Sequence, residues 1–566
     1  MTYASIHPVT RHAFALAAAL SAVAAVTIVA AAPPTQPPQA VAVAARPATA
    51  DVDRIFTKWT ASTPGCAVGV GVGGAPVLTR AYGLADLEHD VANTPDTLFE
   101  AGSVSKQFTA AAVLLLARDG KLSLDDPVRT YLPEVPDYGA PLTIRHILTH
   151  TSGLRDWGNI EAIAGWPRTT RVYTQAHVLD IVSRQHALNF TPGTHWSYSN
   201  TGYNLAAMIV TRVSGESFAA FTRRRIFEPL GMTHTSWRDD HTRVVKGRAI
   251  AYAETRDGFH TEMPFEDVYG NSSLLTDVGD LLKWNEHFDT PPTGGEALVK
   301  EQQQPGHFND GRVHHYALGL EVGAYKGVRQ VDHSGSTAGY RAHLARYPDQ
   351  RVSIAVLCNV SSGQATQYAH AVADLYLADR LKPPTSPAPA HTLTDAELDA
   401  AAGLYRHTVT GVPLTVARDK AALRAGRGSV LVPMSASRLV TAARQTWEFD
   451  GRGGLRVRDE FGSADDYVRT TPAKPTAEDL RAFTGTYTSA EAETTMTAAM
   501  DADALVLKRR PDIVITLTPI YPDAFSGGAF GTVIFIRDGS GRPVGFRVSQ
   551  DRVWDLRFTR EDESKR

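Results

Sequence analysis

The stretch "SVSKQFTAAAVLLLARDG", from Ser103 to Gly120, joins a polar segment directly to an apolar helix. Ser103 and Lys106 are three residues apart, which places both side chains on one face of the helix start. Because the residues that follow Lys106 are almost all apolar, we expect its amine to be desolvated. Desolvation lowers the pKa of a lysine and lets its neutral amine accept a proton. A helix cap followed by a solvated lysine is the alternative that a lone Ser-x-x-Lys would favour.

A second motif, "SYSN", places Tyr198 and Asn200 just before a helix that we expect to begin near Tyr203. In a functional interpretation, Tyr198 brings a phenol near Ser103 and Asn200 offers its amide to a substrate carbonyl. In the structural alternative this is a polar turn in which Asn200 caps the helix.

A third motif, "HSG", places His333 and Gly335 at the end of a strand-like run. The glycine would let a substrate backbone approach the strand edge. A loop histidine with satisfied hydrogen bonds is the alternative interpretation.

Strand and helix signals alternate around these motifs from residue 51 to residue 381. A hairpin is expected in residues 66–86, and three consecutive strands are expected in residues 328–335, 341–348 and 351–360. Strands at both ends with helices between them predict an α/β (α+β) domain whose antiparallel sheet is built from both ends of the segment.

A Pro-rich linker at residues 382–392 precedes a change to short strands and turns. Leu398, Gly403 and Tyr405 recur as Leu480, Gly485 and Tyr487, each 82 residues later. We therefore expect two copies of one antiparallel β-barrel, at residues 393–472 and 475–566. The final strand of the second copy is expected at "VWDLRFTR", residues 553–560.

Residues 1–50 are predicted to be a signal or anchor with a spacer. Ala13–Ala32 carries no charge and is followed by small-residue cleavage sites. The run is also long enough to span a bilayer, so cleavage and retention as a membrane anchor both stay open. We expect a periplasmic or secreted protein, or one anchored in the inner membrane.

The composition sets further bounds. The 566 residues carry a net charge of -3, which gives no electrostatic reason to expect a nucleic-acid partner. The two cysteines, Cys66 and Cys358, lie in apolar runs and are expected to be buried free thiols. They offer no zinc-type spacing, and no metal site is predicted.

Taken in order, Ser-x-x-Lys, Tyr-x-Asn and His-x-Gly resemble the motifs of the serine β-lactamase and penicillin-binding-protein superfamily. The likeness covers residues 60–380 and includes "HTSGLRDW", residues 150–157. Within the superfamily the chain is most similar to the class C-like serine hydrolases. One catalytic domain followed by two lipocalin-like barrels resembles the D-aminopeptidases in particular.

This resemblance implies that Ser103 is the nucleophile, Lys106 its proton acceptor and Tyr198 a proton relay. Asn200, His333 and Gly335 would bind substrate. The backbone N–H groups of Ser103 and Ser336 would form the oxyanion hole. No cofactor or metal is implied.

The resemblance also bears on the substrate. Most β-lactamases have a lysine where this chain has His333, and a neutral imidazole would not anchor a substrate carboxylate. We therefore expect small ester, amide or D-amino-acid peptide substrates, with a true β-lactamase or D,D-carboxypeptidase as the alternative. A cell-wall-binding or sensor protein with weak catalysis is a further alternative.

The role of the barrels stays open between covering the catalytic mouth and forming a homodimer. In the D-aminopeptidase branch a loop of the last barrel reaches the active site. The candidates here are the turn "KRRPDIV", residues 508–514, and "FSGGAFG", residues 525–531.

Overall fold

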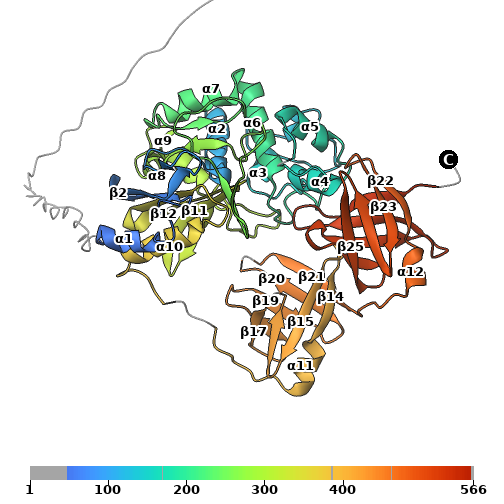
Figure 1. Cartoon of the computed structure of the whole chain (residues 1–566). Coiled ribbons are helices and arrows are strands. Elements are labelled where there is room, and N and C mark those ends of the chain that lie inside the picture. The colour runs from blue at the N-terminus through green and yellow to red at the C-terminus, as the bar shows by residue number, and fades with distance from the viewer. Residues whose placement is uncertain (1–46, 169, 384–386, 427, 461, 563–566) are drawn as a thin grey trace, which may run out of the picture. The chain divides into compact units, whose positions relative to one another are not determined.

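A computed structural model describes residues 47–168, 170–383, 387–426, 428–460 and 462–562 (Figure 1). The expected export segment, Ala13–Ala32, lies outside these residues. Within the described part of the chain, no helix is both long enough and apolar enough to cross a membrane.

The first half of the chain contains a six-stranded antiparallel sheet in the order β10-β11-β12-β13-β1-β2. The strands are β1 (Cys66–Val72), β2 (Ala75–Tyr82), β10 (Glu321–Tyr325), β11 (Val328–Thr337), β12 (Tyr340–Tyr347) and β13 (Val352–Cys358). Strand β1 thus pairs with β13, which lies far along the chain, and β2 extends the sheet beside β1, which confirms the expected sheet. Short strands outside this sheet are β3 (Leu84–Asp86), β4 (Val91–Ala92), β5 (Phe99–Glu100), β6 (Ser236–Trp237), β7 (Tyr252–Thr255), β8 (Gly258–Thr261) and β9 (Leu274–Thr276).

The expectation of free thiols is wrong, because Cys66 and Cys358 form a disulfide. These two residues are direct partners in the pairing of β1 with β13. Their separation of 292 residues hid this register from the sequence.

Helices cover both faces of the sheet. They are α1 (Thr49–Ile55), η1 (Gly102–Val104), α2 (Ser105–Arg118), η2 (Val128–Thr130), α3 (Ile144–Leu148), α4 (Trp157–Ala164), α5 (Gln175–Ser183), α6 (Asn200–Ser214), α7 (Phe218–Thr222), η3 (Arg223–Phe227), α8 (Val278–His287), α9 (Gly295–Gln302), η4 (Pro348–Gln350) and α10 (Ala365–Tyr376). Apolar residues of α1 and α10 form one buried cluster with strand residues such as Val68 and Val356. Helices α2, α6 and α8 contribute to a second cluster.

Helix α2 is the buried centre of this second cluster. All of its residues from Ser105 to Leu116 are buried, so both polar and apolar positions of the helix face protein. Gly120, two residues after the helix, has a φ of +69°, as expected for a glycine that ends a helix. The apolar helix expected after Ser103 is therefore confirmed, and it is buried.

Two closed eight-stranded barrels follow, coloured orange and red in Figure 1. The first contains β14 (Gly403–His407), β15 (Pro413–Asp419), β16 (Ala422–Ala425), β17 (Ser429–Pro433), β18 (Arg438–Val440), β19 (Thr446–Phe449), β20 (Gly454–Arg458) and β21 (Ala464–Thr470). The second contains β22 (Gly485–Ser489), β23 (Thr494–Asp501), β24 (Ala504–Arg509), β25 (Ile513–Tyr521), β26 (Ala524–Ser526), η5 (Gly528–Phe530), β27 (Thr532–Arg537), β28 (Pro543–Ser549) and β29 (Leu556–Arg560).

The repeat seen in the sequence corresponds to a short helix followed by the first strand of a barrel, and this arrangement occurs twice. Helix α11 (Asp395–Ala401) precedes the first barrel and α12 (Ala477–Arg481) precedes the second, each with a threonine capping box. The Tyr405 hydroxyl donates to the Ala401 carbonyl at 2.9 Å, and the Tyr487 hydroxyl donates to the Phe483 carbonyl at 2.7 Å. Each of the two repeated tyrosines thus ties the first strand of its barrel to the residues just before it.

Candidate active site

Ser103 lies in η1, in a segment that packs directly against strand β11. Gly102 has a φ of +54°, and a Cβ at this position would lie 2.6 Å from the backbone nitrogen of Ser336. A Cβ on Gly335 would lie 2.1 Å from the Ala101 carbonyl oxygen. The two glycines therefore allow the segment that carries Ser103 to approach the strand. The expected approach of a substrate backbone to the strand edge at Gly335 stays a prediction.

Strand β11 has a free edge next to this segment. Its pairing with β10 ends at Asp332, whereas its pairing with β12 continues to Thr337. The side chain of Ser336 is exposed on this strand. Ser103 and Ser336 are thus neighbours, as their expected roles in an oxyanion hole require, and those roles stay predictions.

The Lys106 amine is fully buried and has three polar neighbours. Its Nζ lies 3.1 Å from Ser103 Oγ, 2.9 Å from Asn200 Oδ1 and 2.8 Å from the Asn271 carbonyl oxygen. The two amide oxygens can only accept hydrogen bonds, so a neutral amine donates its two N–H groups to them. Its lone pair then points toward the Ser103 hydroxyl.

The charge state of Lys106 favours this arrangement. Burial lowers the pKa of Lys106 well below its usual value, and the nearby positive charge of Arg552 lowers it further. The Asp156 carboxylate acts in the opposite direction. A lysine with a lowered pKa can serve as a general base near neutral pH.

Tyr198 completes the group around Ser103. Burial raises the pKa of the Tyr198 phenol, and a contact with the Ser103 hydroxyl partly opposes the rise. The Lys106 amine lies 4.8 Å from the centre of the Tyr198 ring. His150, from the loop that precedes α4, packs against the same ring at 4.2 Å between centroids. Tyr198 therefore keeps its proton at neutral pH and can pass it on rather than act as a phenolate.

Asn200 is the first residue of α6, which begins three residues earlier than expected. The capping position is Ser199, and the Asn200 side chain is turned to Lys106. The Asn200 backbone N–H donates to Asp156 Oδ2 at 2.7 Å. Asp156 also caps α4 through Gly158 and so joins the two helix starts.

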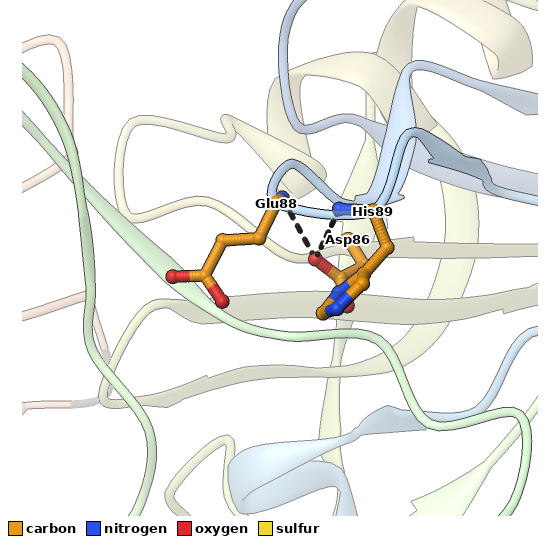
Figure 2. A group of neighbouring side chains, drawn as sticks. All are labelled: Asp86, Glu88 and His89. Carbon is orange, nitrogen blue, oxygen red and sulfur yellow. Dashed lines mark hydrogen bonds and ion pairs between the residues drawn. The ribbon is translucent and has the colours of Figure 1, made fainter.

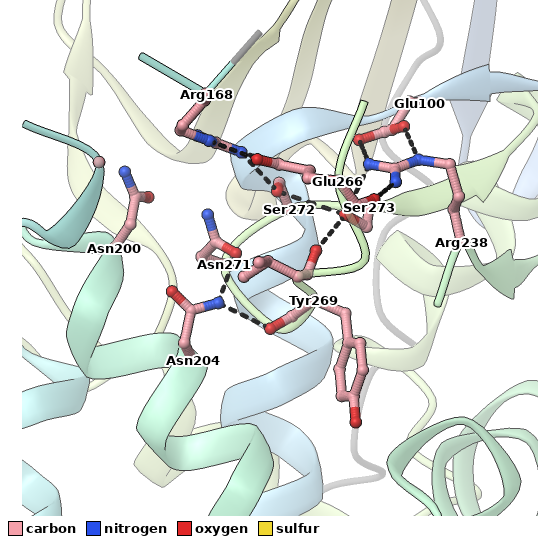
Figure 3. A network of polar contacts seen from close by, with 12 residues as sticks. Glu100, Arg168, Asn200, Asn204, Arg238, Glu266, Tyr269, Asn271, Ser272 and Ser273 are labelled. Carbon is pink, nitrogen blue, oxygen red and sulfur yellow. Dashed lines mark hydrogen bonds and ion pairs between the residues drawn. The ribbon is translucent and has the colours of Figure 1, made fainter. Parts of the chain in front are cut away.

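Asn271 was not found from the sequence, although its carbonyl orients Lys106. Figure 3 shows the network that fixes it: the Asn204 amide donates to Asn271 Oδ1 at 2.7 Å and to the Tyr269 carbonyl at 2.8 Å. Asn204 in turn accepts from the Trp157 indole at 3.0 Å. A backbone carbonyl leaves no signature in a sequence, so only the fold could reveal this contact.

Two ion pairs, one part-buried and one fully buried, border this network in Figure 3. Arg168 donates to Glu266 at 2.7 Å, and Arg238 donates to Glu100 at 2.8 Å. Because each arginine has its own carboxylate, these charges are largely balanced within the protein.

His333 is buried in β11 as a neutral ring. Its Nδ1 lies 2.6 Å from the Ser334 carbonyl oxygen, and its Nε2 lies 2.8 Å from the Tyr316 hydroxyl. A carbonyl can only accept, so Nδ1 carries the proton and Nε2 accepts from Tyr316. Burial lowers the pKa of His333 to about 3. The ring therefore offers no positive charge to a substrate at neutral pH.

A loop of the second barrel, residues 550–555 between β28 and β29, reaches this site. The Arg552 guanidinium lies 4.7 Å from the centre of the Tyr198 ring. The Arg552 carbonyl accepts from the Asp156 backbone N–H at 3.2 Å and from the Asn189 side chain at 3.1 Å. The barrel thus contributes a cation directly beside a predicted catalytic tyrosine.

The sequence pointed to other segments for this contact. In the turn at residues 508–514, Arg509 donates to the Ala162 carbonyl at 2.6 Å, at the far end of α4 from Asp156. Residues 525–531 form the end of β26, η5 and the turn into β27. The expected final strand at residues 553–560 begins only at Leu556, because Val553 to Asp555 belong to the loop.

Three groups of histidine and carboxylate side chains in the described residues have spacings that could hold a metal ion. They are Asp86–Glu88–His89, Asp96–His234–Asp277 and Asp240–His241–Asp267. In Figure 2 the Asp86 carboxylate accepts from the backbone N–H groups of Glu88 and His89, as in an ordinary turn. None of these three groups contains a predicted site residue.

Comparisons with known proteins place the chain among related sequences. The Beta-lactamase family matches residues 52–378. The chain is 30% identical over 317 residues to penicillin-binding protein 4* of Bacillus subtilis, a match that covers 53% of this chain and 68% of that protein. It is 29% identical over 296 residues to the D-aminopeptidase of Brucella ovis, covering 52% of this chain and 56% of that enzyme.

A solved structure shares the fold at lower identity. The octameric penicillin-binding protein homologue from Pyrococcus abyssi matches with a TM-score of 0.53 and 22% identity. The match covers 74% of this chain and 98% of that chain.

Proposed function

The chain belongs to the beta-lactamase family and is a serine hydrolase, and we propose that it cleaves small esters, amides or D-amino-acid peptides through an acyl-enzyme on Ser103. The observation that carries the proposal is the position of the Lys106 amine. Asn200 and the Asn271 carbonyl take up its two N–H groups and leave its lone pair for Ser103.

In the proposed first half-reaction, the Ser103 proton moves to Lys106 while Oγ attacks the substrate carbonyl carbon. The backbone N–H groups of Ser103 and Ser336 donate hydrogen bonds to the carbonyl oxygen and stabilise the negative charge that develops on it. Tyr198 passes the proton from Lys106 to the leaving group as the ester or amide bond breaks. The products of this half-reaction are the free alcohol or amine and an acylated Ser103.

In the second half-reaction, water replaces the leaving group. Lys106 accepts a proton from the water, whose oxygen attacks the acyl carbon. The bond to Ser103 Oγ then breaks, and the proton returns to the serine. The acid is released and the site is restored.

The substrate class rests on two supports. One relative of similar sequence is named a D-aminopeptidase, and His333 is neutral where most β-lactamases carry a lysine. We therefore place small ester, amide or D-amino-acid peptide substrates before β-lactams. The name penicillin-binding protein of another relative keeps a β-lactamase or D,D-carboxypeptidase as the second candidate.

A substrate panel tests this proposal. The purified protein would be compared on a p-nitrophenyl ester, D-alanine p-nitroanilide, its L counterpart and nitrocefin, with kcat/KM as the measure. Ser103→Ala should abolish turnover, and Lys106→Met should lose about four orders of magnitude, because the two residues act as one unit. A folded Ser103→Ala protein with full activity would refute the mechanism. A preference for nitrocefin of about a hundredfold, 2.7 kcal/mol, would favour the second candidate.

Export from the cytoplasm is also part of the proposal. It is supported by the uncharged run Ala13–Ala32 and by the Cys66–Cys358 disulfide, since disulfides persist in oxidising compartments. Mass spectrometry of envelope and medium fractions would distinguish a cleaved from an anchored form. A full-length product found solely in the cytoplasm would contradict it.

Self-association is a last part of the proposal. It is supported by the homologue from Pyrococcus abyssi, which is described as octameric. Light scattering on the purified protein would give its oligomeric state, and a monomer at micromolar concentration would argue against a stable homodimer.

A further inference from the structure

We infer that Arg552, from the loop of the second barrel, binds a carboxylate of the substrate and gives the Ser103 site a preference for anionic esters and amides. This inference rests on the proposed function of Ser103. In this inference the residue that selects substrates by their charge is Arg552 of the second barrel, and not His333 of the catalytic domain.

The loop that carries Arg552 is held by its backbone. Buried Arg155 donates to the carbonyls of Trp554 and Asp555, each at 3.1 Å. Asn189 accepts from the Trp554 backbone N–H at 2.8 Å and donates to the Arg552 carbonyl. These hydrogen bonds use backbone atoms of the loop and not the Arg552 side chain. They hold the loop beside Tyr198 and leave the Arg552 guanidinium free to bind a ligand.

The Arg552 guanidinium is available to a ligand. Its side chain is 35% exposed, and the ion pair that it forms within the described residues is a long one, 3.9 Å to Asp551. Asp551 is 94% exposed, and an exposed pair of this kind contributes little. A guanidinium presents five N–H donors in a planar fork that matches a carboxylate.

The other charged groups near Tyr198 do not compensate this charge. Burial lowers the pKa of Lys106, which favours its neutral form, and lowers that of His333 to about 3. The Asp156 carboxylate already accepts from the backbone N–H groups of Gly158, Asn159 and Asn200. Burial raises the pKa of Glu321 to about 7, which reduces its negative charge at neutral pH.

This charge balance predicts which substrates bind. A carboxylate within reach of Arg552 gains a charge-assisted hydrogen bond in a partly desolvated place. A free ammonium group at the same place is repelled. Among the small esters, amides and D-amino-acid peptides of the proposed function, those with a carboxylate near the scissile bond are therefore preferred, and those with a free ammonium group there are disfavoured. The neutral His333 then argues only against a carboxylate anchor on β11.

The test uses matched pairs of esters on the full-length protein. In one pair the carboxylate is on the leaving group: para-acetoxybenzoate against its methyl ester. In the other it is on the acyl side: mono-p-nitrophenyl glutarate against p-nitrophenyl butyrate. The readout is the ratio of kcat/KM for the anionic ester to that for the neutral ester, so differences in intrinsic reactivity cancel between variants.

Arg552→Gln should lower this ratio about tenfold, the size expected for the loss of one charge-assisted hydrogen bond. Arg552→Glu should lower it further, and Arg552→Lys should retain part of it. Arg542→Gln is the matched control, because Arg542 is an exposed arginine at the other end of β28. The pair that responds identifies the side of the scissile bond that faces Arg552.

Two different failures can be told apart. If wild-type protein hydrolyses none of the esters, the proposed function fails. If Ser103-dependent hydrolysis is seen but Arg552→Gln leaves the ratio unchanged in both pairs, or slows both members equally, then Arg552 does not read substrate charge and the inference is overturned.

Discussion

The two barrels are copies of one unit, yet they contact the first half of the chain very differently. The apolar interior of the second barrel belongs to the same buried cluster as the core around α2, whereas the interior of the first barrel forms a separate cluster. Arg155 forms an ion pair with Glu491 of the second barrel at 3.0 Å, with its side chain 1% exposed. At the first barrel, the Gly462 carbonyl accepts at 2.5 Å from Arg312 of the first half of the chain, whose side chain is partly exposed.

The difference in contact is accompanied by a difference between two corresponding loops of the barrels. The last two strands of each barrel are joined by a loop, residues 459–463 in the first and 550–555 in the second. The first loop begins with Asp459 and Glu460, whereas the second carries Arg552 to Tyr198. The two barrels therefore share a fold but not a role. The loop at residues 550–555 brings the second barrel to the candidate active site.

The largest expected difference between the barrels is in stability. Arg155→Met should cost about 3–5 kcal/mol in the free energy of unfolding, because it removes a buried guanidinium that pairs with Glu491 and donates to two carbonyls of the loop. Arg312→Met, the matched change at the first barrel, should cost less than about 1 kcal/mol, since its side chain is partly exposed. Urea-induced unfolding followed by circular dichroism measures both. Equal losses would contradict the asymmetry of the two contacts.

A smaller effect is expected at the loop itself. Asn189→Leu removes two hydrogen bonds to the loop backbone and should cost about 2 kcal/mol of stability, at about 1 kcal/mol per bond. It should also reduce kcat/KM for an anionic ester more than for a neutral one, since Arg552 is then less well placed. If Arg312→Met had the same effect on this ratio, the second barrel would have no special role in the site.

The smallest expected effect is on the pH profile. Lys106 must be neutral to accept the Ser103 proton, so kcat/KM for a neutral ester should rise with pH as Lys106 loses its proton. Arg552 lowers the pKa of Lys106, so Arg552→Gln should raise this pKa and move the acidic limb of the profile to higher pH. Arg458→Gln, beside the corresponding loop of the first barrel, should leave the limb in place. A limb that stays in place in Arg552→Gln, or moves to lower pH, would show that this charge does not act on Lys106.

The sequence was sufficient for much of the fold and for the group around Ser103. The Ser103–Lys106 spacing, the three motifs and the repeated Leu, Gly and Tyr positions are local patterns. The structure places Ser103 and Lys106 at the start of a buried helix, His333 in strand β11 and the repeated residues at corresponding positions of the two barrels. What stayed hidden depends on pairing between distant segments. The Cys66–Cys358 disulfide needs the register of β1 with β13, and the Asn271 carbonyl needs the fold around Lys106.

Arg552 illustrates the same limit. Its neighbours Val553 and Trp554 are typical of a strand, so the segment looked like the end of a barrel rather than a loop. The loop conformation is imposed by Arg155, Asn189 and Asp156, which lie several hundred residues away in the chain. Tertiary contacts thus overrode a local strand preference.

The most direct test of the account is to locate the acyl group during turnover. Wild-type protein would be quenched in acid within the first turnovers of a slowly released p-nitrophenyl ester, and then digested and mapped by mass spectrometry. We expect one acyl group per chain, on the peptide that contains Ser103, and no labelling of Ser103→Ala. An acyl group on another residue, or equal labelling of the Ser103→Ala protein, would contradict the central claim that Ser103, activated by Lys106, is the nucleophile.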